Sequence, residues 1–366
     1  MTNEIQSAMT ESLKAAEATT EAKNTSLKND RILDIKDLYV WYKTYRGYAK
    51  VINGVDFHVY SGEKVGLVGE SGCGKTTMMK TVLQVLDPTT LHIPEGKVLL
   101  QGHDVLNLEP DSLQEIRRKV VSMISQEPMA ALNPVFSIGA QMRDIIKFSG
   151  QYPDAKSKED LNKLASAAIS DVMISDPDRI LKSYPHQLSG GMRQRICIAC
   201  SLVTPRDLLI ADEPGTALDV TIQDQIHRLL RTLVEEKGRS LIMITHSLGV
   251  ARELVDRIYV MYAGNVVECA NTKNLFSNPC HPYTVGLLDC VPRLSGGGLS
   301  AGIYGYVPDY INSPPGCRFC LRCPHATEIC HNEKPPMVEV EEGHTVACFL
   351  FEDKGQIVNK EGGGVQ

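Results

Sequence analysis

The central part of the chain alternates between short apolar runs and longer segments of helical period. Residues 64–68, 208–211 and 241–245 are almost entirely apolar and include β-branched side chains, which predicts strands buried on both faces. Residues 221–237 repeat apolar side chains every three or four positions and stop at Gly238, which predicts an amphipathic helix. Its predicted buried face consists of Ile222, Ile226, Leu229, Leu230 and Leu233. Buried strands that alternate with helices predict an α/β fold around a parallel sheet.

The two ends of the chain differ from this centre. Residues 1–30 are rich in Thr, Ser, Ala, Glu and Lys and lack the apolar core of a secretory signal peptide, which predicts a flexible tail. Residues 295–315 are rich in Gly, Ser and Pro, and they lead into five cysteines within the last fifty residues. We therefore predict a small cysteine-rich module over residues 271–352 and a second tail over residues 353–366.

The composition argues against two broad classes of protein. Of 366 residues, 43% are hydrophobic and 22% are charged, and no run of about 18 apolar residues occurs, so any contact with a membrane should be peripheral. The net charge of −6 comes without a clustered basic excess, which argues against a nucleic-acid partner. Eleven cysteines without an export signal predict thiols or metal ligands in a reducing compartment rather than disulfides.

A glycine-rich segment directly after the first of these predicted strands matches the phosphate-loop pattern G-x-x-x-x-G-K-[ST]. It reads Gly69-Glu70-Ser71-Gly72-Cys73-Gly74-Lys75-Thr76 and continues with Thr77. Glycines let the backbone wrap around a phosphate chain with its N–H groups pointing inward. Lys75 would reach the β- and γ-phosphates, and the Thr76 hydroxyl would bind Mg²⁺. Because a strand and a helix flank the motif, we predict an ATP site rather than a chance glycine-rich turn.

The predicted strand at residues 208–211 ends in two carboxylates, Asp212 and Glu213. Such a pair could simply mark an exposed strand end. Beside a phosphate loop, a carboxylate at the carboxyl end of a parallel strand holds Mg²⁺, usually through water, and Asp212 fits this role. Glu213 then lies where a second carboxylate can act as general base on the attacking water.

The segment upstream of this strand reads Leu188-Ser189-Gly190-Gly191-Met192-Arg193-Gln194-Arg195. Its ordinary interpretation is a serine-capped helix start, whose bare backbone N–H groups also form a ready anion site. The segment resembles the signature motif of ABC ATPases. That resemblance implies that Ser189, Gly190 and Gly191 bind the γ-phosphate of a nucleotide held by a second ABC ATPase subunit.

Further elements of that family follow in the expected order. Gln126 resembles the Q-loop glutamine, which the family uses in catalysis and at Mg²⁺, and Asp219 in Ala217-Leu218-Asp219 resembles the D-loop. His246 resembles the switch histidine that senses the γ-phosphate. The residue predicted to stack on adenine is Tyr42, shortly before the first strand pair, with Tyr45 and Tyr48 as alternatives.

Several segments narrow the resemblance. They read Leu132-Asn133-Pro134, Met192-Arg193-Gln194-Arg195, His281-Pro282-Tyr283-Thr284, Gly316-Cys317-Arg318-Phe319 and Arg322-Cys323-Pro324. These segments are similar to those of the ATPases of oligopeptide, dipeptide and nickel permeases. The resemblance implies a P-loop ABC ATPase domain over residues 31–270, with a RecA-like core and a helical subdomain at about 130–200, followed by the permease-type module. Gly215 and Ser247 depart from the family, where threonine and aspartate are usual.

The resemblance further implies an ATP-hydrolysing subunit at the cytoplasmic face of a membrane, which powers import of peptides, nickel or oligosaccharides. Its partners would be a second ABC ATPase subunit, two transmembrane permease subunits and an extracytoplasmic substrate-binding protein. ABC cassettes of DNA repair and translation are the alternative, but they usually carry coiled-coil insertions or tandem cassettes, and this chain has one cassette without sustained heptads. The cargo and the choice between homodimer and heterodimer stay open.

The cysteines near the C-terminus match a pattern of the same family. We assign a [4Fe-4S] cluster to Cys317, Cys323, Cys330 and Cys348. Four thiolates also suit tetrahedral zinc, but zinc sites favour paired C-x2-C steps, and these four cysteines are spread singly. Cys320 makes such a step with both Cys317 and Cys323 and keeps zinc open as an alternative. The histidines close enough in sequence to compete as ligands are His325, His331 and His344.

Overall fold

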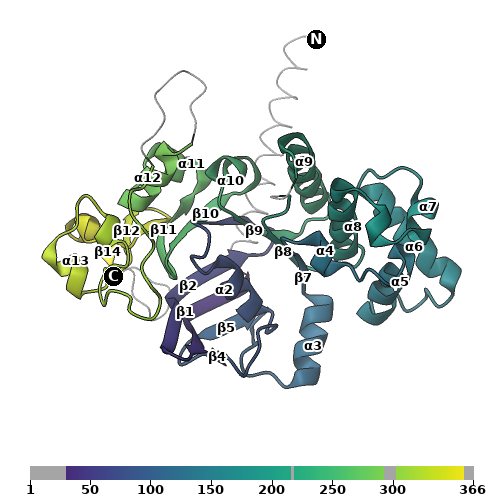
Figure 1. The fold of residues 1–366 in the computed structure, drawn as a ribbon, viewed down its shortest axis with the longest axis horizontal. Coiled ribbons are helices and arrows are strands. Elements are labelled where there is room, and N and C mark those ends of the chain that lie inside the picture. The colour runs from purple at the N-terminus through teal and green to yellow at the C-terminus, as the bar shows by residue number, and fades with distance from the viewer. Residues whose placement is uncertain (1–29, 216–217, 292–301, 358–366) are drawn as a thin grey trace, which may run out of the picture.

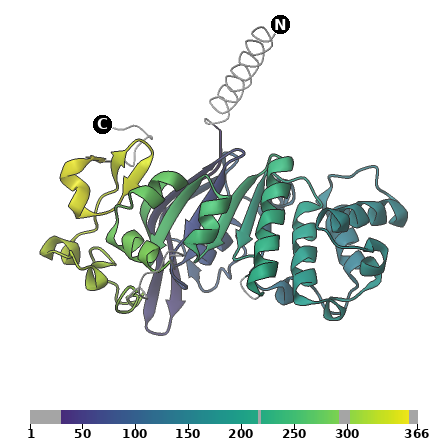
Figure 2. The same cartoon turned by 90° about the horizontal axis from the view of Figure 1, so that it is seen from above.

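The computed structural model describes residues 30–215, 218–291 and 302–357. Nearly all of the predicted N-terminal tail, Ala217 of the D-loop segment and most of the predicted C-terminal tail lie outside these residues. Figures 1 and 2 show an elongated arrangement, with the cysteine-bearing end on one side, the sheets in the middle and a group of helices on the other side. Within the described residues, no helix combines the length and the apolar character needed to cross a bilayer.

Within the described residues, nine strands form the central sheet, in the order β14-β12-β13-β11-β10-β3-β9-β8-β7. Its parallel part consists of β10 (Arg257–Tyr262), β3 (Lys64–Val68), β9 (Ser240–Thr245), β8 (Leu208–Asp212) and β7 (Val121–Ile124). Antiparallel strands continue the sheet, namely β11 (Asn265–Asn271), β13 (His344–Val346), β12 (Val338–Glu341) and β14 (Gln356–Ile357). The three strands predicted from the apolar runs are confirmed, and the cysteine-bearing end shares their sheet.

A second, antiparallel sheet lies next to the first. Its strands are β1 (Arg31–Thr44), β2 (Gly47–Tyr60), β4 (Leu91–His92), β5 (Lys97–Leu100) and β6 (His103–Asp104). Alternate side chains of the parallel strands divide between two cores, so that Leu67 packs with the antiparallel sheet and Val68 packs with the helices. Tyr42 lies inside β1, opposite Ala49, and not before the first strand pair as the sequence had suggested. The reason is that β1 runs without a break to the tight turn before Gly47.

Helices pack against both faces of the parallel strands, because Met78 and Ile116 belong to the core shared with the antiparallel sheet, whereas Met142 and Leu229 belong to the core on the opposite face. Those of the cassette are α2 (Lys75–Val82), α3 (Pro110–Lys119), α4 (Pro128–Ala131), α5 (Ile138–Ser149), α6 (Lys158–Asp171), α7 (Pro177–Lys182), α8 (Gly190–Leu202), α9 (Val220–Glu236) and α10 (Leu248–Leu254), with the 3-10 turn η1 (Pro185–Gln187). Those of the C-terminal part are α11 (Thr272–Ser277), α12 (Pro282–Asp289), η2 (Cys320–Arg322), α13 (Glu328–Asn332) and η3 (Phe349–Lys354). The predicted helix at residues 221–237 is α9, and of its five predicted core residues only Ile222 stays half-buried.

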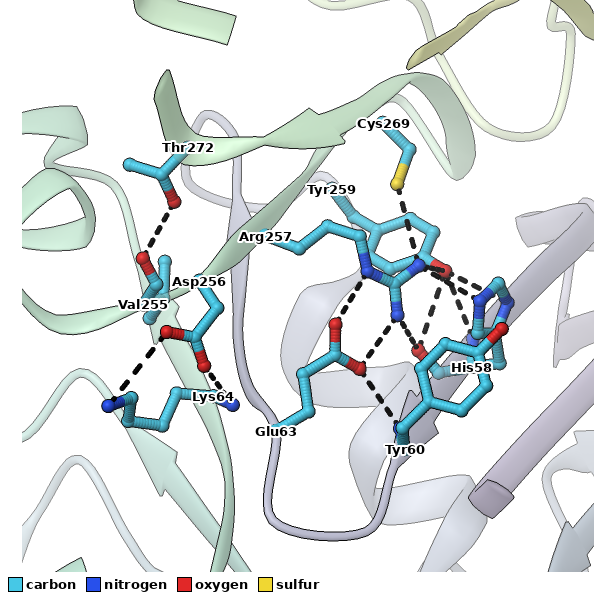
Figure 3. A network of polar contacts seen from close by, with 10 residues as sticks. All are labelled: His58, Tyr60, Glu63, Lys64, Val255, Asp256, Arg257, Tyr259, Cys269 and Thr272. Carbon is cyan, nitrogen blue, oxygen red and sulfur yellow. Dashed lines mark hydrogen bonds and ion pairs between the residues drawn. The ribbon is translucent and has the colours of Figure 1, made fainter. Parts of the chain in front are cut away.

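A polar network joins the two sheets where β3 and β10 begin, at the edge opposite the phosphate loop. The Arg257 guanidinium donates to both carboxylate oxygens of Glu63, at 2.8 and 2.9 Å, and to the Tyr259 hydroxyl at 2.8 Å (Figure 3). Burial, followed by the nearby Arg257 charge, lowers the pKa of His58 to about 3. His58 therefore stays neutral near pH 7, and the network holds the sheets together without titrating there.

Candidate nucleotide site

The phosphate loop at residues 69–74 connects the carboxyl end of β3 to α2. Lys75 opens α2, and its buried ammonium donates to the carbonyls of Gly69 and Glu70 at 2.7 and 3.0 Å. The ammonium thus lies within the loop, where the motif predicts that phosphate binds. A Cβ at Gly69 would lie 2.1 Å from the Met261 carbonyl, and Gly74 has φ +104°, so both positions require glycine.

Thr76 and Asp212 meet beside this loop. The Thr76 hydroxyl lies 2.9 and 3.1 Å from the two carboxylate oxygens of Asp212, the last residue of β8. Asp212 is 3% exposed, and its pKa is raised, first by burial and further by the charge of Glu213. A divalent cation next to these oxygens would compensate the buried negative charge, so the pair fits a Mg²⁺ site.

Three predicted catalytic side chains converge at the carboxyl ends of β7, β8 and β9. Glu213 Oε2 accepts a hydrogen bond from Gln126 Nε2 at 3.2 Å and lies 3.2 Å from His246 Nδ1. The His246 side chain is 52% exposed, so solvent reaches the group. Glu213 has φ 45°, in the left-handed region that non-glycine residues seldom adopt, and strain of this kind gathers at functional sites. A carboxylate held between two polar neighbours beside solvent suits a base that orients water.

The signature segment lies apart from the phosphate loop. Ser189 caps α8, and its hydroxyl accepts a hydrogen bond from the Met192 N–H at 3.3 Å. Cβ atoms at Gly190 and Gly191 would lie 3.2 and 3.1 Å from side chains at the start of α9, namely Leu218 and Ile222. Figure 1 shows α8 among the helices at one end of the molecule, well separated from α2. The start of α8 is thus placed away from the chain's own phosphate loop.

The remaining predicted nucleotide contacts lie on several different elements. Thr77 lies in the first turn of α2, and Ser71 is exposed in the loop. Asp219 caps α9 by accepting from the Ile222 N–H at 3.0 Å. Tyr45 is 96% exposed, and Tyr48 packs its ring against Trp41 and His92, with centroid distances of 5.9 and 5.2 Å. Tyr42 is half-buried on β1, and its role at adenine stays a prediction.

All five C-terminal cysteines line one cavity of about 240 Å³, and none of the eleven cysteines forms a disulfide. His325 lines this cavity as well, whereas His344 is bonded to Glu268, and His331 is not among the lining residues. Burial raises the pKa of Cys317 to about 12 and that of Cys348 to about 11. The structure therefore gathers the four predicted cluster ligands and Cys320 around one cavity.

The sulfurs of the predicted ligands have hydrogen-bond partners. The nearby backbone of Phe319, His325 and Leu350 partly offsets the burial that raises the pKa values of Cys317, Cys323 and Cys348, and the Thr327 hydroxyl lies 3.3 Å from Cys330 Sγ. A different group has the tightest packing of possible metal ligands within the described residues. It consists of Glu268, Cys280 and His344, whose ligand atoms all lie within 4.8 Å of one another.

Sequence reasoning missed three side chains that contact the phosphate loop from the C-terminal part. The Tyr310 hydroxyl donates to the Gly72 carbonyl at 2.7 Å, and Arg322 pairs with the Glu70 carboxylate at 2.9 Å. The Tyr283 hydroxyl accepts from the Glu70 N–H at 2.9 Å. Tyr283 and Arg322 belong to segments typical of peptide permease ATPases, and this was the only feature of the sequence that pointed to them. Their spacing in sequence does not indicate a contact with the phosphate loop.

Known proteins resemble the chain over most of its length. Residues 52–216 match the ABC transporter family model, and residues 267–330 match the model of the oligopeptide/dipeptide transporter C-terminal region. The dipeptide transport ATP-binding protein DppD of Bacillus subtilis (strain 168) is 41% identical, over 89% of this chain and 97% of that protein. The oligopeptide transport ATP-binding protein OppD of Escherichia coli (strain K12) is 40% identical, over 87% and 93% respectively.

A solved structure shares the cassette. It is the dimeric, post-hydrolysis state of the ATP-binding cassette MJ0796 bound to ADP and Pi, with 28% sequence identity and a TM-score of 0.59. The match covers 66% of this chain and 98% of that one. The cysteine-bearing end therefore lies largely beyond what the two cassettes share.

Proposed function

The chain belongs to the ATP-binding subunits of the oligopeptide and dipeptide ABC transporters, and from this premise we propose that it hydrolyses ATP to drive peptide import through a separate permease. One observation carries the catalytic part of the proposal. The phosphate loop, the Thr76–Asp212 pair and the group of Gln126, Glu213 and His246 lie at the same edge of one parallel sheet. The peptide cargo rests on what the relatives transport.

The side chains at this edge divide the work of hydrolysis. Lys75 would contact the β- and γ-phosphates through charge-assisted hydrogen bonds. Mg²⁺ held by Thr76 and Asp212, with Gln126 nearby, would neutralise charge on the phosphates. Glu213 would accept a proton from the attacking water while the water oxygen bonds to the γ-phosphorus. The bond between the γ-phosphorus and the ADP oxygen would break, which yields ADP and phosphate. Gln126 and His246 would keep the Glu213 carboxylate in place.

The position of α8 supports a site completed by a second ABC ATPase subunit. Ser189, Gly190 and Gly191 begin a helix whose free N–H groups suit a γ-phosphate, and this helix lies away from the chain's own loop. Closure of two such subunits on two ATP molecules would bring each signature helix to the partner's nucleotide. The proposed assembly adds two transmembrane permease subunits and an extracytoplasmic substrate-binding protein, which places this chain at the cytoplasmic face of the membrane.

The cysteine cavity supports a metal centre, and the [4Fe-4S] assignment to Cys317, Cys323, Cys330 and Cys348 remains our proposal. The shared cavity favours bound thiolates, and the Thr327 hydroxyl beside Cys330 Sγ adds a hydrogen bond of the kind that tunes such clusters. Tetrahedral zinc requires sulfurs about 3.8 Å apart. No three of these cysteines have sulfurs that all lie within 4.8 Å of one another, in contrast to the ligand atoms of Glu268, Cys280 and His344. The wider spacing favours a cluster that places iron and sulfide between the thiolates.

Anaerobic purification distinguishes the two metals. We expect brown protein with broad absorbance near about 400 nm and about four irons per chain. Colourless protein with about one zinc per chain would refute the cluster and favour zinc, with Cys320 or His325 as a further ligand. Cys290→Ser serves as a control for the loss of a cysteine that is not a predicted ligand, because Cys290 is exposed and lies outside the cavity. This variant should keep the metal content of the parent.

Purification of the transporter tests the proposed function. A tagged chain extracted from membranes with mild detergent should carry a second ATPase subunit and two permease subunits. The binding protein that stimulates its ATPase activity should hold peptides, identified by mass spectrometry after release. Nickel or an oligosaccharide in that protein would refute the peptide cargo and leave the ATPase mechanism intact. Failure of the purified subunit to hydrolyse ATP would refute the mechanism itself.

A further inference from the structure

The C-terminal part of the chain holds the outer side of the phosphate loop. Tyr310 and Gly72 are 238 positions apart in sequence, and Arg322 and Glu70 are 252 positions apart, yet both pairs are hydrogen-bonded. The backbone of the Tyr310 segment is attached as well, because the Tyr310 carbonyl accepts from the Lys50 N–H at 2.9 Å. The segment is thus fixed at the cassette before its side chain reaches the loop.

The outer side matters because of how a phosphate loop works. A loop that turns N–H groups toward phosphate leaves some of its carbonyls on the outer side, and each of these needs a donor there. The Cys73 carbonyl receives the Gly264 N–H at 2.9 Å, and the Gly72 carbonyl receives the Tyr310 hydroxyl. The Gly72–Cys73 peptide is planar, so an outward Gly72 oxygen directs the Cys73 N–H to the inner side of the loop, where it donates to the Glu70 carbonyl at 3.2 Å. Tyr310 therefore fixes the orientation of one peptide that lines the site.

Arg322 is fixed on both sides of its guanidinium. Nη2 donates to the Ile303 carbonyl at 3.0 Å and Nε to the Tyr304 carbonyl at 3.1 Å, while Nη1 pairs with Glu70. The Arg322 side chain is 5% exposed and that of Glu70 is 28% exposed, so solvent screens this ion pair only in part. Arg322 directly precedes Cys323 and ends η2, which begins at Cys320. The segment that carries cavity cysteines therefore also carries the cation that holds the phosphate loop.

We infer that Tyr310 and Arg322 are positioning residues of the nucleotide site, which hold the phosphate loop in its binding shape and make ATP affinity depend on the C-terminal part of the chain. The inference rests on the proposed ATPase function. It adds that a chain with every cassette motif intact binds ATP weakly when these two contacts are lost. Neither residue touches the group of Gln126, Glu213 and His246, so turnover at saturating ATP should change little.

Tyr310→Phe is the sharpest test, because it removes one oxygen and keeps the ring. We expect the Kd for ATP, measured by titration calorimetry, to rise about 2- to 12-fold, the usual effect of one neutral hydrogen bond. KM for ATP should rise in parallel with little change in kcat. Tyr306→Phe is the matched control, because Tyr306 lies in the same segment and is 93% exposed. It should leave both constants unchanged.

Arg322 provides a second, independent measurement. Arg322→Ala should raise the Kd for ATP on the order of 10-fold, since an ion pair of low exposure is lost. Arg322→Lys should recover part of the affinity, because an ammonium can still pair with Glu70 but cannot also bond both neighbouring carbonyls. Partial rescue of this kind would not follow if Arg322 merely supported folding.

The outcomes separate the inference from its premise. Parental ATP affinity in both Tyr310→Phe and Arg322→Ala would overturn the inference and leave the ATPase function standing. A loss of affinity accounted for by the unfolded fraction, measured by thermal unfolding without nucleotide, would overturn it too. Failure of the parent chain to bind ATP would instead refute the proposed function.

Discussion

Two glutamate–histidine pairs in this protein differ in almost everything except composition. Glu213 and His246 meet at 3.2 Å at the edge of the parallel sheet, and the histidine is half exposed. Glu268 and His344 meet at 2.8 Å between β11 and β13, where both side chains are 0% exposed. Glu268 also accepts the N–H groups of Cys280 and His281, each at 2.8 Å. The first pair faces solvent, whereas the second is closed and has both Glu268 oxygens hydrogen-bonded.

The contrast teaches that coordination decides what such a pair can do. Glu213 is bonded by side chains at an open site, so its carboxylate can still take a water molecule. Glu268 has its charge balanced by His344 and both oxygens bonded, so it can only hold β11, β13 and the start of α12 together. With Cys280 it makes a three-residue group, one ligand short of a closed structural zinc site. We therefore assign this buried group to stability.

The largest effect should come from Glu213→Gln. Removal of the general base should lower kcat for ATP hydrolysis by about 10²- to 10⁴-fold, while ATP binding and the thermal unfolding midpoint stay near those of the parent. Steady-state hydrolysis and nucleotide titration measure the two quantities separately. Glu236→Gln, on the exposed end of α9, is the control and should match the parent. Turnover within a few-fold of the parent would remove Glu213 from its role.

Glu268→Gln should show the opposite pattern. It leaves His344 buried without its counter-charge and the amide nitrogen facing a backbone donor, which should lower the free energy of unfolding by about 2 to 4 kcal/mol. Turnover per folded molecule should not change. Urea unfolding and active-site titration provide the two measurements, with Glu342→Gln in the exposed β12–β13 turn as control. Unaltered stability together with lost turnover would reverse our assignment of the two pairs.

A smaller effect should appear with pH. Burial alone would lower the pKa of His344, but hydrogen bonds and charge from Cys280 and Glu268 outweigh it and raise the pKa to about 9. The folded state then binds a proton that the unfolded state, with an ordinary pKa of about 6.5, releases. This contribution is complete below about pH 6.5 and is lost as the pH rises through 9. The parent should therefore lose about 1 to 3 kcal/mol of stability relative to Glu268→Gln between these limits.

Urea unfolding of both proteins at pH 6.5 and 9.5 measures this loss. Comparison with Glu268→Gln cancels groups that titrate elsewhere in the chain. A stability difference between the two proteins that does not change with pH would show that His344 is neutral in the folded state. The closed pair would then be held by neutral hydrogen bonds, and its contrast with Glu213 and His246 would rest on burial alone.

The catalytic residues at the strand ends could be predicted from the sequence, because their positions depend only on neighbouring residues in the chain. Lys75 directly follows the loop after β3, and Asp212 and Glu213 end or directly follow β8, so the order of strands and loops already places them at one edge. The contacts of Tyr310 and Arg322 could not be read in this way. They depend on how the whole C-terminal part packs against the cassette, and no periodicity encodes a pairing across about 240 positions. The position of Tyr42 was missed for a different reason, because β1 continues to a tight local turn and pairs Tyr42 with Ala49.

The long separation between the phosphate loop and Tyr310 also has a consequence for how the protein is made. Domains fold as they leave the ribosome, from the N-terminus onward. The phosphate loop, α8 and His246 all emerge before residue 250, whereas the donor for the Gly72 carbonyl, Tyr310, emerges about sixty residues later. An unfinished chain can therefore hold every motif of the ATPase and still lack a finished nucleotide site. If Tyr310 positions the loop as we infer, tight binding of ATP begins only after the Tyr310 segment has been synthesised and has packed against the loop.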